Sequence, residues 1–165
     1  MAFAVMHVLG AIIILEIVRH YIIGPKKFPK YLVVIGGIAG LLPDIDIPLG
    51  WVYFWVSGVH VDLHATSISH SLIWVVLFVS LGLLFRCIAD KRWSYIAYVI
   101  AAGWAIHIGF DWFYGEYKLI FWPFATSQSF FPTWEIWRYS ESIDAILLVL
   151  WLVHEEIHKR IKDYF

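Results

Sequence analysis

Long apolar blocks separated by short polar segments dominate the sequence, and their lengths predict membrane-spanning helices. An α-helix needs roughly 20 mostly apolar residues to cross about 30 Å of hydrocarbon. Four blocks reach that length: Ala4 to Ile23, Ile68 to Ile88, Ser94 to Phe113 and Ser142 to Ile161. We therefore expect an all-α, polytopic membrane bundle with about four full spans.

A fifth apolar block, Tyr31 to Leu42, would reach only about 18 Å as a helix. It contains Gly36 and Gly40 in a GxxxG pair, which lets a helix approach its neighbours closely. We expect a short helix buried inside the bundle. The sequence LLPDID at 41–46 follows it, and non-helical backbone at membrane depth is tolerated only beside protein or a watery cavity. These residues should therefore line such a cavity.

The composition supports a membrane protein with one domain over residues 1–165. Of its residues 61% are hydrophobic and 15% charged, against roughly 45–50% and 25% in soluble domains. The net charge of -1 lacks the basic excess typical of nucleic-acid binding, so we expect no nucleic-acid partner. The first block has no basic segment before it and no small-residue cleavage site after it, so we expect it to be retained.

The basic residues predict the orientation of the helices. Lys and Arg total twelve, and ten of them cluster on alternating connections: Arg19, Lys26, Lys27, Lys30, Arg86, Lys91, Arg92, Lys159, Arg160 and Lys162. By the positive-inside rule, that side and the C-terminus should be cytoplasmic, in a plasma (inner) membrane. Residues 47–63 and 114–138 are rich in aromatic side chains and should form interfacial helices and loops on the opposite side.

Several ionisable residues interrupt the apolar blocks at a common depth. At a rise of about 1.5 Å per residue, these ionisable residues lie about 20–27 Å from the predicted cytoplasmic ends of their helices. They are His7, Asp44, His70, His107 and Asp111, with Asp46 and His64 close by in the sequence. His107 and Asp111 are four residues apart and share a helix face. Ionisable residues inside a membrane are costly and usually functional.

This ligand set predicts a divalent metal centre. Mixed imidazole and carboxylate ligands favour zinc, with manganese or iron as alternatives, and seven candidates exceed the needs of one tetrahedral ion. We expect two ions bridged by Asp44 or Asp46, which would activate a metal-bound water to attack an ester, most plausibly a phosphoester. A site recessed in the outer part of the membrane suggests a lipid-linked or amphiphilic substrate, beside the surrounding membrane lipids.

Four motifs in order, with the early His7, resemble a known family over about residues 1–125. They are LLPDID at 41–46, HATSISHS at 64–71, HIGFD at 107–111 and FWPF at 121–124. Together they resemble the membrane-bound metal-dependent hydrolases typified by the bacterial inner-membrane protein YdjM. The resemblance implies a polytopic, zinc-dependent hydrolase with distant kinship to phospholipase C-like enzymes. It carries over a ligand set by direct motif match: His7, Asp44, Asp46, His70, His107 and Asp111.

The second motif departs from the family pattern. The family has H-R-G-x-T-H-S, in which the second histidine is five positions after the first. In this chain His70 is six positions after His64, and no arginine lies between them. The ligand that precedes His70 therefore stays open among His60, Asp62 and His64. The missing arginine also removes the expected contact with a phosphate group.

Other interpretations use the same residues differently. Asp44 and Asp46 could simply cap a helix. The ligand set could instead serve a metal or proton transporter, or a metal-stabilised scaffold without hydrolysis. HEEIH at 154–158 formally matches HExxH, a zinc motif in which the glutamate is the general base. It would form a site on the cytoplasmic face, with Glu16 or His20 as a third ligand.

Overall fold

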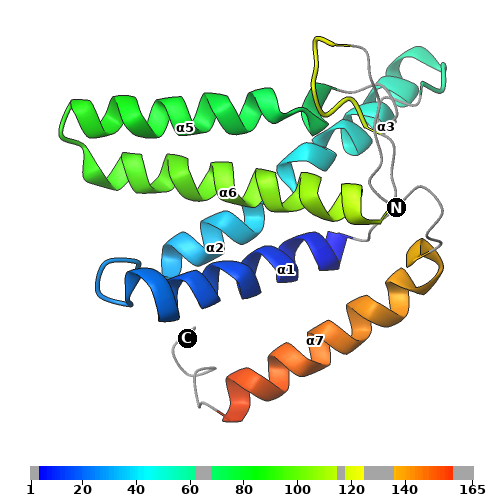
Figure 1. The fold of residues 1–165 in the computed structure, drawn as a ribbon. Coiled ribbons are helices and arrows are strands. Elements are labelled where there is room, and N and C mark those ends of the chain that lie inside the picture. The colour runs from blue at the N-terminus through cyan, green and yellow to red at the C-terminus, as the bar shows by residue number, and fades with distance from the viewer. Residues whose placement is uncertain (1–3, 62–67, 115–117, 125–135, 158–165) are drawn as a thin grey trace.

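The computed structural model describes residues 4–61, 68–114, 118–124 and 136–157, and these residues form a bundle of helices (Figure 1). The all-α prediction is confirmed for this part of the chain. The main helices are α1 (Ala4–Ile17), α2 (Lys30–Ala39), α3 (Asp46–Ser57), α5 (Leu72–Cys87), α6 (Lys91–Phe113) and α7 (Ser140–Ile157). Four single-turn helices join them: η1 (Val18–Ile23), η2 (Leu42–Ile45), η3 (Ile68–His70) and η4 (Ile136–Tyr139).

The predicted short helix is α2, which packs against both α1 and α6. Its glycines allow the close approach. A Cβ atom on Gly40 would lie 2.8 Å from the carbonyl oxygen of His7, and one on Gly36 would collide with the side chain of Leu15. On α6, a Cβ atom on Gly103 would lie 3.1 Å from the Gly40 nitrogen and would overlap the Gly36 carbonyl oxygen. The close approach expected of this GxxxG pair is confirmed, but α2 buries only its glycine-bearing face, since Tyr31, Val34 and Ile38 are exposed.

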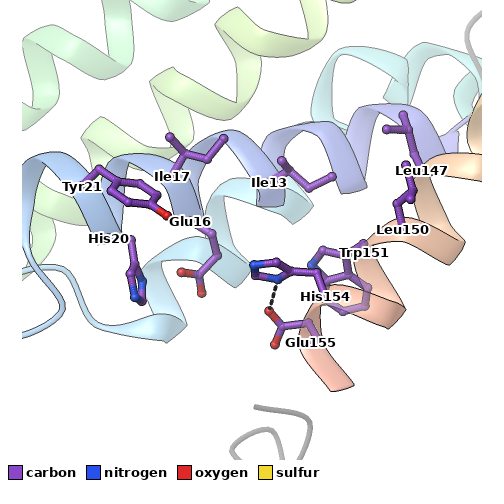
Figure 2. A pocket seen from close by; sticks show the side chains of 10 residues that line it. All are labelled: Ile13, Glu16, Ile17, His20, Tyr21, Leu147, Leu150, Trp151, His154 and Glu155. Carbon is purple, nitrogen blue, oxygen red and sulfur yellow. Dashed lines mark ion pairs between the residues drawn. The ribbon is translucent and has the colours of Figure 1, made fainter. Parts of the chain in front are cut away.

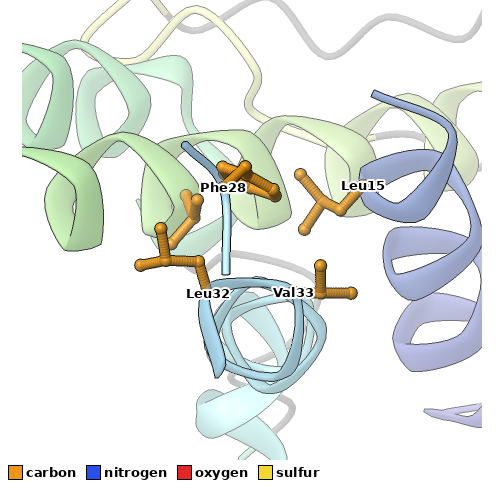
Figure 3. Packing of buried hydrophobic residues seen from close by; sticks show 5 residues of the cluster. Leu15, Phe28, Leu32 and Val33 are labelled. Atoms are coloured by element: carbon orange, nitrogen blue, oxygen red, sulfur yellow. The ribbon is translucent and has the colours of Figure 1, made fainter. Parts of the chain in front are cut away.

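A hydrophobic cluster fills the space between α1, α2 and α6 at one end of the bundle (Figure 3). Its buried members are Leu15, Phe28, Leu32, Val33 and Val99. Because lipid is as apolar as these side chains, close van der Waals packing rather than the hydrophobic effect holds such a cluster inside a membrane. Next to this cluster, Arg19 donates from Nε to the Phe28 carbonyl oxygen at 2.9 Å and from Nη1 to Glu16 Oε2 at 3.0 Å. Glu16 and Arg19 are thus an ion pair at i, i+3 spacing.

Two helices in the described residues are long and apolar enough to cross a membrane, Val5–Ile23 and Lys91–Phe113. A third crossing would form if α2 and the helical segment Leu42–Ser57, bent by 44° at their break, make one broken span. The expected four full spans are therefore not confirmed. The block beginning at Ile68 starts its α-helix only at Leu72, because Ser71 is an extended N-cap whose hydroxyl accepts from the Ile73 N–H.

The span predicted in the last block is not confirmed either, because its helix α7 carries four acidic residues. Glu141 and Asp144 lie in its first part, and Glu155 and Glu156 lie near its end. By contrast, α3 is short and apolar, and its Trp55 and Val56 are 83% and 84% exposed. Such exposure suits the interfacial helix expected in residues 47–63.

Candidate metal centre

The break after α2 brings the first aspartate to the centre of the bundle. Gly40 ends the helix, and its N–H still bonds to the Gly36 carbonyl oxygen at 3.1 Å. The chain then turns through η2, where Pro43 occupies the first turn and the Asp44 N–H donates to the Leu41 carbonyl oxygen. A proline is tolerated there because the first N–H groups of a helix have no internal partner. Asp44 is therefore delivered beside His107 in the C-terminal part of α6.

The second part of the centre is the η3 turn, which precedes α5. The Trp104 indole N–H on α6 donates to the Ser69 carbonyl oxygen at 2.8 Å, which ties this turn to α6. The Leu72 N–H donates to the Ile120 carbonyl oxygen at 2.9 Å, which ties it to the loop after α6. Both bonds hold His70 in place, and its side chain is fully buried.

Three ligand-type atoms from three elements form a nearly equilateral triangle. Asp44 Oδ1 lies 3.4 Å from His70 Nε2 and 3.5 Å from His107 Nε2, and the two Nε2 atoms are 3.3 Å apart. Two ligands of a tetrahedral zinc ion, each bound at about 2.0–2.1 Å, are about 3.3–3.4 Å apart. Asp44, His70 and His107 therefore match one face of a zinc tetrahedron.

The other ring nitrogens fix which atom of each histidine is available. His107 Nδ1 lies 2.6 Å from the Gly40 carbonyl oxygen, which only accepts, so Nδ1 must carry the proton. Ser69 donates its hydroxyl proton to Asp46 Oδ2 at 2.8 Å, so its oxygen accepts from His70 Nδ1 at 3.0 Å. In the neutral tautomers both Nε2 atoms then present lone pairs toward each other and toward Asp44. The two lone pairs and the Asp44 carboxylate repel one another unless a cation or additional protons lie between them.

Asp111 and His7 extend the cluster. Asp111 Oδ2 lies 3.2 Å from His107 Nε2 and 3.3 Å from His70 Nε2, while its Oδ1 lies 3.4 Å from His7 Nε2. The His7 ring stacks on the His107 ring at 3.7 Å between centroids. Within the described residues Asp111 Oδ2 and His7 Nδ1 are buried without a hydrogen-bond partner. Buried polar atoms without partners are costly, so this chemistry also suits a bound cation.

The two possible metal groups compete for one atom. Three residues form the first group, Asp44, His70 and His107, and His7, His107 and Asp111 form the second. His107 belongs to both, but its Nδ1 is engaged with Gly40, so its Nε2 can bind only one ion. Within the described part of the chain, one complete three-residue ligand set is therefore available at a time.

Asp46 lies on the outer side of His70 rather than inside the triangle. Its Oδ2 accepts from Ser69 and is 3.5 Å from His70 Nδ1. A carboxylate that contacts the second nitrogen of a metal-binding histidine fixes the tautomer of that ring and strengthens it as a ligand. The geometry thus gives Asp46 a different position from Asp44, although the sequence pattern treats the two aspartates alike.

The cluster is open to its surroundings mainly at Asp44. The side chains of His7, His70, His107 and Asp111 are at most 4% exposed, whereas that of Asp44 is 19% exposed. Lys118 is only 5% exposed, and its charge is near enough to act on His70. Sequence reasoning missed Lys118, because a single lysine in an aromatic loop carries no spacing signal.

The other predicted candidates have different outcomes. His60 is exposed at the end of the α3 region, and Asp62 and His64 lie outside the described residues. Asp144, in the first part of α7, is buried, and it is near enough to His7 for the two charges to interact.

The HEEIH motif lies at the far end of α7. His154 and Glu155 line a pocket together with Glu16 and His20, the residues that the sequence suggested as partners. His158 lies outside the described residues. In the part of the chain that the structure covers, these side chains do not form a three-ligand group close enough for one ion.

The sequence matches the family described as YdjM inner membrane protein over residues 1–161. The match spans nearly the whole chain, including the residues of the histidine–aspartate cluster and α7. Comparison with curated proteins finds no match, and comparison with solved structures finds none either.

Proposed function

The chain belongs to the YdjM inner membrane protein family, and we propose that it is a membrane-embedded, metal-dependent hydrolase. The observation that carries the proposal is the triangle of Asp44 Oδ1, His70 Nε2 and His107 Nε2, with separations of 3.3–3.5 Å. Three protein ligands and one open corner are typical of catalytic rather than structural zinc sites. Structural zinc sites fill all four corners with protein ligands.

A divalent metal, most suitably zinc, would lower the pKa of a bound water toward 7 and stabilise negative charge in the transition state. Asp44, His70 and His107 would hold it. Asp46 and Ser69 would orient His70 and keep its Nε2 lone pair available. A second ion remains part of the proposal, and it would need His7, Asp111 and a ligand outside the described residues, such as His64.

The proton and the leaving group can be followed through the chain's own residues. Water adds to the ester phosphorus, the bond from phosphorus to the leaving oxygen breaks, and the water loses a proton. Asp111 Oδ2 has no hydrogen-bond donor among the described residues, so it is suited to accept that proton and to return it to the leaving oxygen. Asp44 lies at the exposed edge of the cluster and would contact the substrate side.

The surroundings favour an anionic, amphiphilic substrate. The buried ammonium group of Lys118 acts on His70 and would attract a phosphate group, in the absence of the arginine that the family pattern contains. The neighbouring α3 exposes Trp51, Trp55 and Val56, which suits contact with lipid. We propose a lipid-linked phosphoester, hydrolysed on the extracytoplasmic side.

Transport of metal or protons is less well supported. A carrier needs polar groups along a route to the opposite face of the membrane. Below the cluster, the space between α1, α2 and α6 is filled by Leu15, Leu32, Val33 and their hydrophobic neighbours (Figure 3). These side chains offer no ligand for a cation in transit.

The test compares three variants of the purified protein in detergent. Asp44→Asn and His107→Ala should each lose bound metal, measured by elemental analysis, together with hydrolysis of an acyl-chain phosphodiester. Glu155→Gln should change neither. If Asp44→Asn stays active and metal-loaded while Glu155→Gln is inactive but retains its metal, the chemistry belongs to the HEEIH motif and this proposal is wrong.

A further inference from the structure

A cavity lies between α1 and α7, away from the histidine–aspartate cluster (Figure 2). Its volume is about 630 Å³, within the roughly 300–1,000 Å³ of typical ligand pockets. Glu16, which contributes to it, is nine residues after His7 on the same helix, or about 13 Å along the axis. The cavity is therefore separate from the proposed hydrolytic site and does not depend on it.

The lining of this cavity is divided into an apolar part and a polar end. Apolar side chains from both helices form most of the wall: Ile13, Ile17, Leu147, Leu150 and Trp151. The polar side chains gather at the end where α7 finishes: Glu16, His20, His154 and Glu155 (Figure 2). A pocket with this division matches an amphiphile, whose chain and head group need different surroundings.

Glu155 gives the polar end its chemical preference. Its side chain is 2% exposed, and within the described residues its Oε2 is buried without a hydrogen-bond partner. Its Oε1 lies 3.5 Å from Nδ1 of His154, which is 54% exposed. A buried carboxylate is costly unless a cation or a hydrogen-bond donor meets it. The pocket thus offers an acceptor that lacks a donor.

The second carboxylate of the pocket already has a cationic partner. Glu16 Oε2 accepts from Arg19 at 3.0 Å, and Arg19 is also held by the Phe28 carbonyl oxygen. Among the described residues, Glu155 is therefore the pocket carboxylate with one oxygen, Oε2, that no donor meets. The wall beside it includes His20 and Tyr21 from η1, a π-helical turn of a kind that is rare and often found at functional sites.

We propose that this pocket binds one phospholipid with a primary-amine head group, its ammonium on Glu155 and an acyl chain along the apolar wall. A primary ammonium offers three N–H donors to Oε2, whereas a trimethylated ammonium of the same charge offers none. A metal ion suits the pocket less well, because its side chains do not form a three-ligand group in the described part of the chain.

The proposal is tested by native mass spectrometry of the delipidated full chain. Three lipids with identical dioleoyl chains are titrated separately: phosphatidylethanolamine, phosphatidylcholine and phosphatidylglycerol. We expect the ethanolamine lipid to bind about tenfold or more tightly than the other two, as a hydrogen bond to a charged group would give. Equal binding of the three lipids would overturn the proposal.

Variants locate the effect within the pocket. Glu155→Gln should abolish the preference for the ethanolamine lipid, whereas Glu156→Gln, which removes an exposed neighbouring charge, should keep it. Leu147→Trp should fill the wall and weaken all three lipids. The thermal unfolding temperature and the metal content of each variant show whether it is folded.

Two results would contradict the assignment. If Glu155→Gln is folded and keeps the preference, the carboxylate does not recognise the amine. If wild-type protein binds zinc that His154→Ala loses and His107→Ala retains, the pocket is a metal site of the HEEIH type. The first result leaves the hydrolase proposal unaffected, since that proposal is tested with Asp44→Asn. The second would also contradict the hydrolase proposal, which expects His107→Ala to lose its metal.

Discussion

Asp46→Asn distinguishes a supporting carboxylate from a metal ligand. Asp46 Oδ2 accepts from Ser69 at 2.8 Å and is 3.5 Å from His70 Nδ1, on the side of the ring away from Asp44. Asparagine keeps the size and one acceptor oxygen but removes the charge that polarises the Ser69–His70 pair. Replacing a partner of this kind typically lowers metal affinity about 10–100-fold.

The corresponding loss of zinc-binding free energy is about 1.4–2.8 kcal/mol. It should be measured with purified protein in detergent by competition against a chromophoric zinc chelator at fixed pH. Ser69→Ala removes the link between Asp46 and His70 and should give a loss of similar size. The double variant should lose little more than either single variant, because both act through the same ring nitrogen.

His107→Ala provides the reference for loss of a direct ligand. It removes Nε2 from the triangle, and zinc should no longer copurify with the protein. If Asp46→Asn loses zinc as completely as His107→Ala, Asp46 is a ligand, as the sequence pattern had suggested. If Asp46→Asn binds zinc with wild-type affinity, the supporting role argued from the Ser69 contact is wrong.

Three further predictions follow from the packing, the charges and the topology. Gly103→Ala should destabilise the protein by about 1–3 kcal/mol, because its Cβ would overlap the α2 backbone. The control is Gly109→Ala on the same helix, whose Cβ would meet nothing within 4 Å and should not lower the thermal unfolding temperature. Lys118→Met should weaken hydrolysis of the acyl-chain phosphodiester about 10–100-fold with unchanged metal content, and loss of metal as well would show a structural role instead. A membrane-impermeant thiol reagent applied to whole cells should label Ser57→Cys but not Lys27→Cys, and the opposite pattern would invert the predicted orientation.

Sequence reasoning could predict the cluster because the constant rise per residue of a spanning helix converts position in the sequence into depth in the membrane. Once the spans were fixed by their apolar lengths, a constant rise per residue put His7, His107 and Asp111 at one depth. The structure brings those three residues within 5 Å of one another through their ligand atoms. Depth alone was enough, because a buried ionisable residue in a membrane helix must face other protein groups.

Depth in the membrane could not distinguish the roles of Asp44 and Asp46. Both follow Pro43 and both lie near the same depth, so their spacing carries no information about which one faces His107. Their directions depend on η2, a tight turn whose first N–H bonds form with Leu41 rather than within a regular helix. The predicted number of spans is not confirmed for a related reason. Caps and charges near helix ends make the apolar helices shorter than the apolar blocks of the sequence.

Gly40 connects the packing of the bundle to the chemistry of the centre. It is the second glycine of the GxxxG pair, and the close approach of α2 to α1 and α6 depends on its missing side chain. Its carbonyl oxygen, freed because α2 ends there, accepts the proton of His107 Nδ1 and leaves Nε2 as the ligand atom. A larger residue at this position would push α2 away from His7 and would also lengthen the 2.6 Å contact that sets the tautomer. The glycine motif that lets α2 pack closely therefore also orients His107, one ligand of the proposed metal site. This double role of Gly40 accounts for an apolar helix that ends inside the bundle, just before Asp44 and Asp46.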